Sequence, residues 1–341
     1  MFRKISKYLL TFCGNPVIIY LELILNSIKK GDFHMENKRT YPKKQAIWYF
    51  ILVFALAYAL QIAAMAFYPS YGYQLTLVVV MLMPMLTVLI LHKGLGKAKT
   101  GINWKPKKGA VKWFVAAWFA PVLLTAVGGT LYYLMFPLQF DPNMGYLAAQ
   151  IPENVDLQGL TYPMLTAIEL ISAVTYAPLM NMFFALGEEI GWRGYMVPML
   201  TEKIGKKPAL LLGGVIWGAW HWPIIIGVGY NYGTGYSGAP FTGMAMMCLF
   251  ATVVGILLTW LYEKSGSIWA PSLAHGAINA CSALPLLFTD GSLTQYLLGP
   301  ATSGLITLIP FMIVAIVVFF KYFQIAIATC NFSERINNLM I

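Results

Sequence analysis

Three charged side chains interrupt the apolar stretch FFALGEEIGWRGY at 183–195. Glu188 and Glu189 are adjacent, and Arg193 follows Glu189 by four residues. Helical residues four apart lie on one face, so Glu189 and Arg193 are expected to pair and neutralise each other. Glu188 lies about 100° further around the helix. It is therefore the carboxylate that remains free to take a proton from water.

Two of the four histidines also lie within apolar stretches, namely His221 and His275, and Asn279 follows His275 by four residues. A histidine can hold or shuttle a proton beside Glu188, and a His/Asn pair can donate hydrogen bonds to a developing oxyanion. These are the parts that hydrolysis of a peptide bond by an activated water requires.

The elements that must position these residues are membrane-spanning helices. The chain is 59% hydrophobic and 11% charged, with a mean hydropathy of +0.67, far from the composition of soluble domains. A span takes about 20 apolar residues, and eight such stretches are expected at 46–68, 74–92, 111–136, 164–190, 208–227, 241–262, 268–288 and 302–327. The runs are continuous rather than alternating, which excludes a β-barrel. The sequence predicts an all-α polytopic bundle of about eight transmembrane helices with an intramembrane polar site.

The membrane domain is expected to cover 46–327, with the catalytic core in 164–290. A basic cytoplasmic segment of amphipathic character, 1–45, precedes it, and a cytoplasmic tail, 328–341, follows it. A cleaved signal peptide is disfavoured, and Met35 is an alternative start to Met1.

Lys and Arg are confined to alternate connections. The connections at 69–73, 137–163, 228–240 and 289–301 contain neither residue. Positively charged loops stay in the cytoplasm, so both termini are expected to be cytoplasmic, in a plasma membrane of bacterial type. The net charge of +10 then reflects topology and attraction to anionic lipid, and a nucleic-acid partner is not expected.

Counting helix rise from the basic ends places the polar residues in one layer. At 1.5 Å per residue, Glu188, His221, His275 and Asn279 lie roughly 12–20 Å deep. The site is thus expected in the cytoplasmic half or the middle of the bilayer, opening inward. Ionisable residues at that depth are costly unless they meet partners inside the bundle, which favours a functional site.

Three motifs carry a resemblance to a known family. GEEIGWR resembles the E-E-x-x-x-R signature of the CAAX prenyl endopeptidase type II and Abi family, the CPBP intramembrane proteases. Trp217 to His221 resembles the second motif, an aromatic residue four before a histidine, and His275 to Asn279 resembles the third, H-x-x-x-N. Trp217 replaces the commoner Phe or Tyr and is interpreted as an apolar packing residue.

The resemblance implies that Glu188 and His221 activate water, that His275 and Asn279 stabilise the oxyanion, and that Glu189 with Arg193 braces the site. It implies a peptide or protein substrate, either prenylated or otherwise associated with the membrane. Members include eukaryotic enzymes that trim three residues from prenylated CaaX proteins and bacterial proteins linked with bacteriocin processing or self-immunity.

Three alternatives remain open at this point. Glu188, His221 and His275 could bind zinc with water as the fourth ligand, although no H-E-x-x-H occurs, so a metal-free glutamate mechanism without a cofactor is favoured. A proton-coupled transporter also uses intramembrane Glu and His, but the sequence shows neither an inverted repeat nor paired broken helices. A catalytically silent immunity or scaffold protein is the third.

Overall fold

The computed structural model describes residues 41–68, 71–95, 101–151, 155–290 and 296–322, and within these ranges it contains helices and no strand. The predicted basic segment up to residue 40, the alternative start at Met35 and the tail at 328–341 lie outside the described residues.

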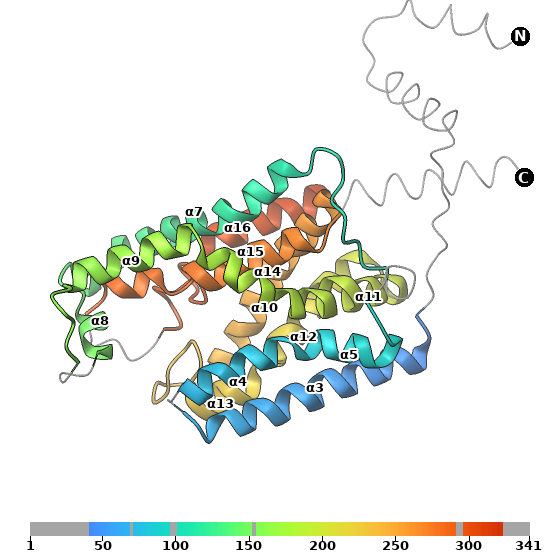
Figure 1. Cartoon of the computed structure of the whole chain (residues 1–341), viewed down its shortest axis with the longest axis horizontal. Helices are drawn as coiled ribbons and strands as arrows, with labels where there is room; N and C mark the ends of the chain where they lie inside the picture. Colours follow the sequence, from blue (N-terminus) through green and yellow to red (C-terminus); the bar gives the residue numbers. More distant parts are fainter. Residues whose placement is uncertain (1–40, 69–70, 96–100, 152–154, 291–295, 323–341) are drawn as a thin grey trace, which may run out of the picture. The chain divides into compact units, whose positions relative to one another are not determined.

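Figure 1 shows the helices in the order in which they follow one another along the chain. The α-helices are α3 (Lys43–Met65), α4 (Tyr71–Met81), α5 (Met83–His92), α7 (Val111–Met135), α8 (Gly145–Gln150), α9 (Tyr162–Val174), α10 (Ala177–Gly191), α11 (Val197–Ile204), α12 (Lys206–Ala219), α13 (Trp222–Val228), α14 (Phe241–Ser265), α15 (Trp269–Cys281) and α16 (Ile309–Val317). Short 3₁₀ turns occur at η1 (Pro137–Gln139) and η3 (Leu284–Phe288), and π turns at η2 (Trp192–Met196) and η4 (Val318–Tyr322).

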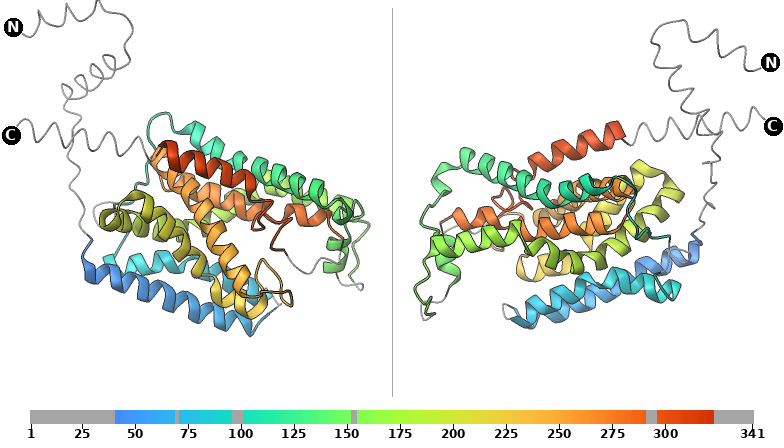
Figure 2. Two further views of the ribbon diagram at one scale, coloured as in Figure 1. Left: turned by 180° about the vertical axis from the view of Figure 1, so that it is seen from behind. Right: turned by 45° about the horizontal axis from the view of Figure 1, so that its top comes forward.

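The chain from Pro42 onward is a helical bundle. Helices α3, α4 and α5 form one edge, α7 and α9 lie on the opposite edge, and α10 lies between them (Figures 1 and 2). Helix α10 contacts α5 on one side and α15 on the other, and α15 in turn contacts α7. The helix that carries Glu188 and Glu189 therefore lies at the centre of the bundle.

The chain folds as an all-α polytopic membrane protein. Among the described residues, five helical segments are long and apolar enough to span a membrane, at Lys43–Met65, Leu75–His92, Val111–Met135, Lys206–Val228 and Phe241–Ser265. The pair Tyr162–Val174 and Ala177–Ile204, bent by 55°, makes a sixth if it is counted as one span. The expected number of eight is not confirmed, because in the described part of the last two stretches the α-helices, α15 and α16, are shorter than a span.

The irregular segment between the short helices α15 and α16 is partly buried inside the bundle. The backbone N–H of Thr302 donates to the carbonyl of Ser282, just after α15, and the Thr302 hydroxyl lies 2.9 Å from that of Thr125, in the middle of α7. Irregular backbone is tolerated at membrane depth only when protein satisfies it. Pro285 lies in the 3₁₀ turn η3 that follows α15, within a run that is otherwise apolar, so hydropathy alone does not reveal where α15 ends.

Glycine permits the contact that joins the two halves of the site. At Gly276 on α15, an added Cβ would lie 2.5 Å from the backbone nitrogen of Met182 and the carbonyl oxygen of Pro178, both on α10. Small residues at such positions let membrane helices approach closely. Because of this contact, His275 lies beside the glutamates of α10.

The basic connections meet at one end of the bundle, which we call the basic end. The Lys107 ammonium donates to the carbonyl of Glu263 at 2.8 Å, and the Ile268 N–H donates to the carbonyl of Asn103 at 2.8 Å. Lys206, at the start of α12, forms an ion pair with the Glu263 side chain. The segment 101–110 thus packs directly over the end of α14 and the start of α15.

The connections without Lys or Arg meet at the opposite end, which we call the Lys/Arg-free end. The Asp141 N–H donates to the carbonyl of Phe288 and the Tyr146 N–H to that of Thr289, each at 2.8 Å. The Tyr296 N–H donates to the carbonyl of Tyr232 at 3.3 Å. The alternation of charge along the sequence therefore corresponds to two distinct ends of the structure.

Candidate active site

Glu189 and Arg193 form the ion pair that their spacing predicts. Arg193 Nη1 lies 2.9 Å from Glu189 Oε1, and both side chains are buried, with 2% and 0% of their surface exposed. The backbone widens from the α-helix into the π turn η2 at Trp192, a feature that is frequent at functional sites. Each buried charge thus compensates the other within one turn of the chain.

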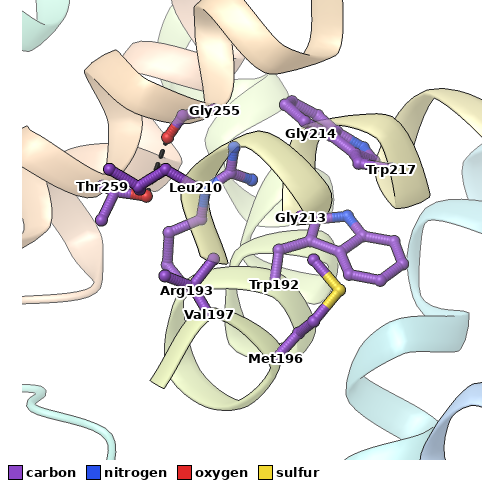
Figure 3. Close-up of a pocket in the computed structure, with 10 residues that line it drawn as sticks. All are labelled: Trp192, Arg193, Met196, Val197, Leu210, Gly213, Gly214, Trp217, Gly255 and Thr259. Carbon is purple, nitrogen blue, oxygen red and sulfur yellow. Dashed lines mark hydrogen bonds between the residues drawn. The ribbon is translucent and has the colours of Figure 1, made fainter. Parts of the chain in front are cut away.

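Figure 3 shows the surroundings of the Arg193 guanidinium, with Trp192 and Trp217 on one side and Gly255 and Thr259 of α14 on the other. The guanidinium carbon lies 4.3 Å from the centroid of the Trp217 ring, which is a cation–π contact. A space of about 10 Å³ adjoins it, about the size of one water. Gly255 leaves room for the arginine, because a Cβ there would lie 3.3 Å from Nη2.

Glu189 also binds the histidine of the third motif. His275 Nδ1 lies 2.8 Å from Glu189 Oε1, the same oxygen that accepts from Arg193. A carboxylate can only accept in such a bond, so we assign the proton to Nδ1. Nε2 is then the nitrogen of His275 that is available to another partner. This contact between α10 and α15 was not foreseen, because spacing along one helix says nothing about the rotation of its neighbour.

Glu188 is held by two indole groups. Its Oε2 atom accepts hydrogen bonds from Trp217 Nε1 at 2.7 Å and from Trp192 Nε1 at 3.2 Å. The interpretation of Trp217 as an apolar packing residue was wrong, because its N–H orients the carboxylate. Two signals in the sequence could have found these contacts. Trp192 follows Glu188 by four residues, and Trp, unlike Phe, carries a donor that needs a partner when buried.

His221 lies in a break between α12 and α13. Pro223 lies in the first turn of α13, where its missing N–H is tolerated, so a new helix begins there instead of α12 continuing. His221 Nδ1 lies 3.0 Å from the carbonyl oxygen of Trp217, which can only accept, so Nδ1 carries the proton and Nε2 is an acceptor. The rings of Trp220, edge-on at 4.9 Å, and Tyr230, parallel at 6.4 Å, flank the imidazole.

The four residues predicted to be catalytic line one cavity. Glu188, His221, His275 and Asn279 all contribute to the walls of a cavity of about 720 Å³. Side chains from α10, from the break between α12 and α13, and from α15 therefore lie around one space, as the depth argument predicted. The Asn279 side chain is exposed. Their individual chemical roles remain predictions.

The cavity extends toward the Lys/Arg-free end. Its walls include residues in or beside all four connections without Lys or Arg, namely Tyr68, Tyr73, Tyr146, Gln150, Tyr230, Asn231, Gly233, Tyr296 and Ala301. No described residue of 101–110, 203–207 or 263–268 lines it. The expectation that the site opens inward stays a prediction. Depth counted along helices measures where a side chain lies, and not which end of the bundle the packing leaves open.

The zinc alternative involves the same residues. Among the described residues, no three His, Cys, Asp or Glu side chains are grouped so that they could hold a metal ion. Glu188 Oε2 and the Nδ1 atoms of His221 and His275 each have a protein partner, which leaves Glu188 Oε1 and the two Nε2 atoms as the atoms that a metal would take. The preference for a metal-free reaction therefore stays a prediction.

Comparison with known proteins matches the part of the chain that builds this site. Residues 170–281 match the family model of type II CAAX prenyl endopeptidase Rce1-like proteins. The CAAX prenyl protease 2 of Methanococcus maripaludis is 29% identical over 110 residues, which are 32% of this chain and 40% of that relative. The match thus spans about two-fifths of the relative's length, and the family segment contains all three motifs in order. Residues 170–281 are therefore similar to the type II CAAX prenyl endopeptidases, the CPBP proteins that the three motifs resemble.

Proposed function

We propose that the protein is an intramembrane endopeptidase in which Glu188 and His221 activate the water that hydrolyses a peptide bond. One observation carries the proposal. Glu188 is buried and has no cationic partner among the described ion pairs. It lines the same cavity as His221, whose Nε2 is free to accept a proton. A general base must reach the proton that it removes, and both groups face the space that a water and a peptide would fill.

In the proposed reaction, the indole N–H groups hold Glu188 Oε2, and Oε1 accepts the proton of the attacking water beside His221. The water oxygen bonds to the peptide carbonyl carbon, and the carbonyl oxygen becomes an oxyanion. Glu188 then returns that proton to the amide nitrogen, directly or through His221, and the C–N bond breaks as the oxyanion reforms a carbonyl. The resulting carboxylic acid gives its proton to the departing amine, so that a carboxylate and an ammonium leave.

His275 and Asn279 are assigned to donate hydrogen bonds to the oxyanion, and they differ in the protonation state that this donation requires. The Asn279 carboxamide carries N–H donors in every protonation state. His275 already uses Nδ1–H on Glu189, so its Nε2 donates only when both nitrogens carry protons. The adjacent Glu189 carboxylate stabilises that cation. Glu189 and Arg193 therefore position His275 rather than touch the substrate.

The substrate is proposed to be a peptide or protein at the membrane. The name of the methanococcal relative, a CAAX prenyl protease, points to prenylated proteins. The resemblance of the three motifs to the CPBP proteases also implies bacteriocin processing or immunity. No described residue of the basic connections at 101–110, 203–207 and 263–268 lines the cavity, which favours a reaction site over a transport path.

The proposal is tested with the full chain in lipid nanodiscs, incubated with a peptide mixture and assayed for new peptide termini by mass spectrometry. We expect cleavage by the wild type and a loss of at least about 100-fold in His221→Ala, with or without a strong metal chelator. A transporter or silent scaffold produces no new termini. Loss of cleavage on chelation, with recovery on adding zinc, would contradict the metal-free route.

A further inference from the structure

The break between α12 and α13, which holds His221, leaves backbone groups that a continuous helix would pair. In an uninterrupted α-helix, the N–H of each residue donates to the carbonyl four residues earlier. Pro223 has no N–H to give to the Ala219 carbonyl, and the regular partner of the Trp220 carbonyl would be the Ile224 N–H. Polar backbone groups at membrane depth must find partners in protein. The break therefore needs partners from another element.

Helix α3, which contacts α13, supplies these partners from two side chains one turn apart. Gln61 Nε2 donates to the Trp220 carbonyl at 2.7 Å, and Gln61 Oε1 accepts from the Ile224 N–H at 3.3 Å. The Tyr58 hydroxyl donates to the Ala219 carbonyl at 2.9 Å. The Gln61 carboxamide thus binds the two backbone groups that a continuous helix would join directly, and Tyr58 supplies the donor that proline lacks.

Gln61 lies in the wall of the active-site cavity but is almost completely buried, with 1% of its surface exposed and both ends of its carboxamide bound to backbone. Building on the proposed function, we infer that Gln61, supported by Tyr58, is a positioning residue for catalysis. It keeps the chain turned at His221, so that Nδ1–H stays on the Trp217 carbonyl and Nε2 stays available to the attacking water. Helix α3 lies outside the three motifs and precedes the segment 170–281.

Loss of the Gln61 carboxamide is expected to move His221, because His221 lies between the two backbone groups that the carboxamide binds. With an apolar side chain in place of Gln61, both groups lose a buried partner, which is costly. They can regain one by bonding to each other, as in a continuous helix. That closure rotates the residues of the turn. A displacement of about 1 Å at a reacting group can lower a rate by about 10²-fold.

The test compares Gln61→Met, which keeps the length of the side chain but has no hydrogen-bond donor, with Thr125→Val as the matched control. Thr125→Val also removes a buried hydrogen bond between distant segments, the one to Thr302, and Thr125 does not line the cavity. In nanodiscs, kcat and KM are measured on a peptide that the wild type cleaves. Solid-state NMR of histidine-labelled protein reports the ring signals of His221, which are assigned by their loss in His221→Ala.

We expect Gln61→Met to lower kcat by about 10–100-fold at an unchanged KM, and to shift the ring signals of His221. Thr125→Val should lower the thermal midpoint but leave kcat and the His221 signals as in the wild type. A role confined to stability would give the same result for both variants. Wild-type kcat or wild-type His221 signals in Gln61→Met would therefore overturn the inference.

Tyr58→Phe decides the question if Gln61→Met does not fold, because it removes one hydroxyl only. It should lower kcat and shift the His221 signals in the same direction as expected for Gln61→Met, and wild-type values of either would then overturn the inference. The NMR measurement also separates the two proposals. A wild type that cleaves no peptide would contradict the proposed function, whereas shifted His221 signals in Gln61→Met would still show that Gln61 positions the histidine.

Discussion

One oxygen atom of Glu189 links the first and third motifs, because it accepts from both Arg193 and His275. Removing one partner of a buried ion pair costs about 3–5 kcal/mol, so Arg193→Met should lower the thermal midpoint and the expression level clearly. The matched control is Lys206→Met, which breaks the partly exposed pair with Glu263, worth about 0–1 kcal/mol. Equal thermal midpoints for the two variants, measured in the same detergent, would contradict a stabilising role for the ion pair between Glu189 and Arg193.

Contacts between residues could be predicted from the sequence only where one helix carries both partners. The pair of Glu189 and Arg193 follows from spacing alone, and the common layer of Glu188 and His221 follows from helix rise. The bond between Glu189 and His275 and the indole bond from Trp217 to Glu188 depend on how neighbouring helices are rotated. Hydropathy does not contain that information.

Helix packing next to the site depends on which glycine faces the neighbouring helix. A Cβ at Gly214 of α12 would lie 2.3 Å from the Thr252 Cα of α14, whereas one at Gly213 would lie 3.4 Å from the flexible Met196 Cε. Gly214→Ala should therefore lower the thermal midpoint, because backbone must move. Gly213→Ala should leave it unchanged or raise it, because Ala is favoured in helices by about 1 kcal/mol over Gly. A midpoint for Gly214→Ala at or above that of Gly213→Ala would contradict this packing.

The long helices could be predicted because each is one uninterrupted apolar run of membrane length, as in α3, α7 and α14. The breaks after α15 and before α16 could not, since they consist of a few Pro, Gly and Thr residues within apolar sequence. Their backbone is satisfied by contacts from other elements, such as that between Thr302 and Ser282, which no local pattern announces.

For the molecule as a whole, the division into a basic end and a Lys/Arg-free end was predictable from charge, whereas the set of connections that line the cavity was not. That set depends on packing between segments far apart in the sequence, such as the packing of 101–110 over α14 and α15.

The charge of the cavity leads to a prediction about substrate ends. A free carboxylate near the scissile bond would lie close to Glu188 with no described Lys or Arg in the walls to compensate it. Matched peptides that end three residues after the scissile bond should therefore be cleaved faster as C-terminal amides than as free acids, by about tenfold in kcat/KM, which corresponds to about 1.4 kcal/mol. A preference for the free acid would show that a cationic group outside the described walls recognises the chain end.

The central claim is that the Glu188 carboxylate removes a proton from the attacking water. Glu188→Gln tests it most directly, because Gln keeps the size of the side chain and an oxygen that can accept from Trp192 and Trp217, but cannot take up the proton. Glu169→Gln, an exposed carboxylate on α9 outside the cavity, is the matched control. In nanodiscs, we predict that peptide cleavage falls by about 10²–10⁴-fold in Glu188→Gln, with an unchanged thermal midpoint, and stays at the wild-type rate in Glu169→Gln. Wild-type cleavage by Glu188→Gln would contradict the account.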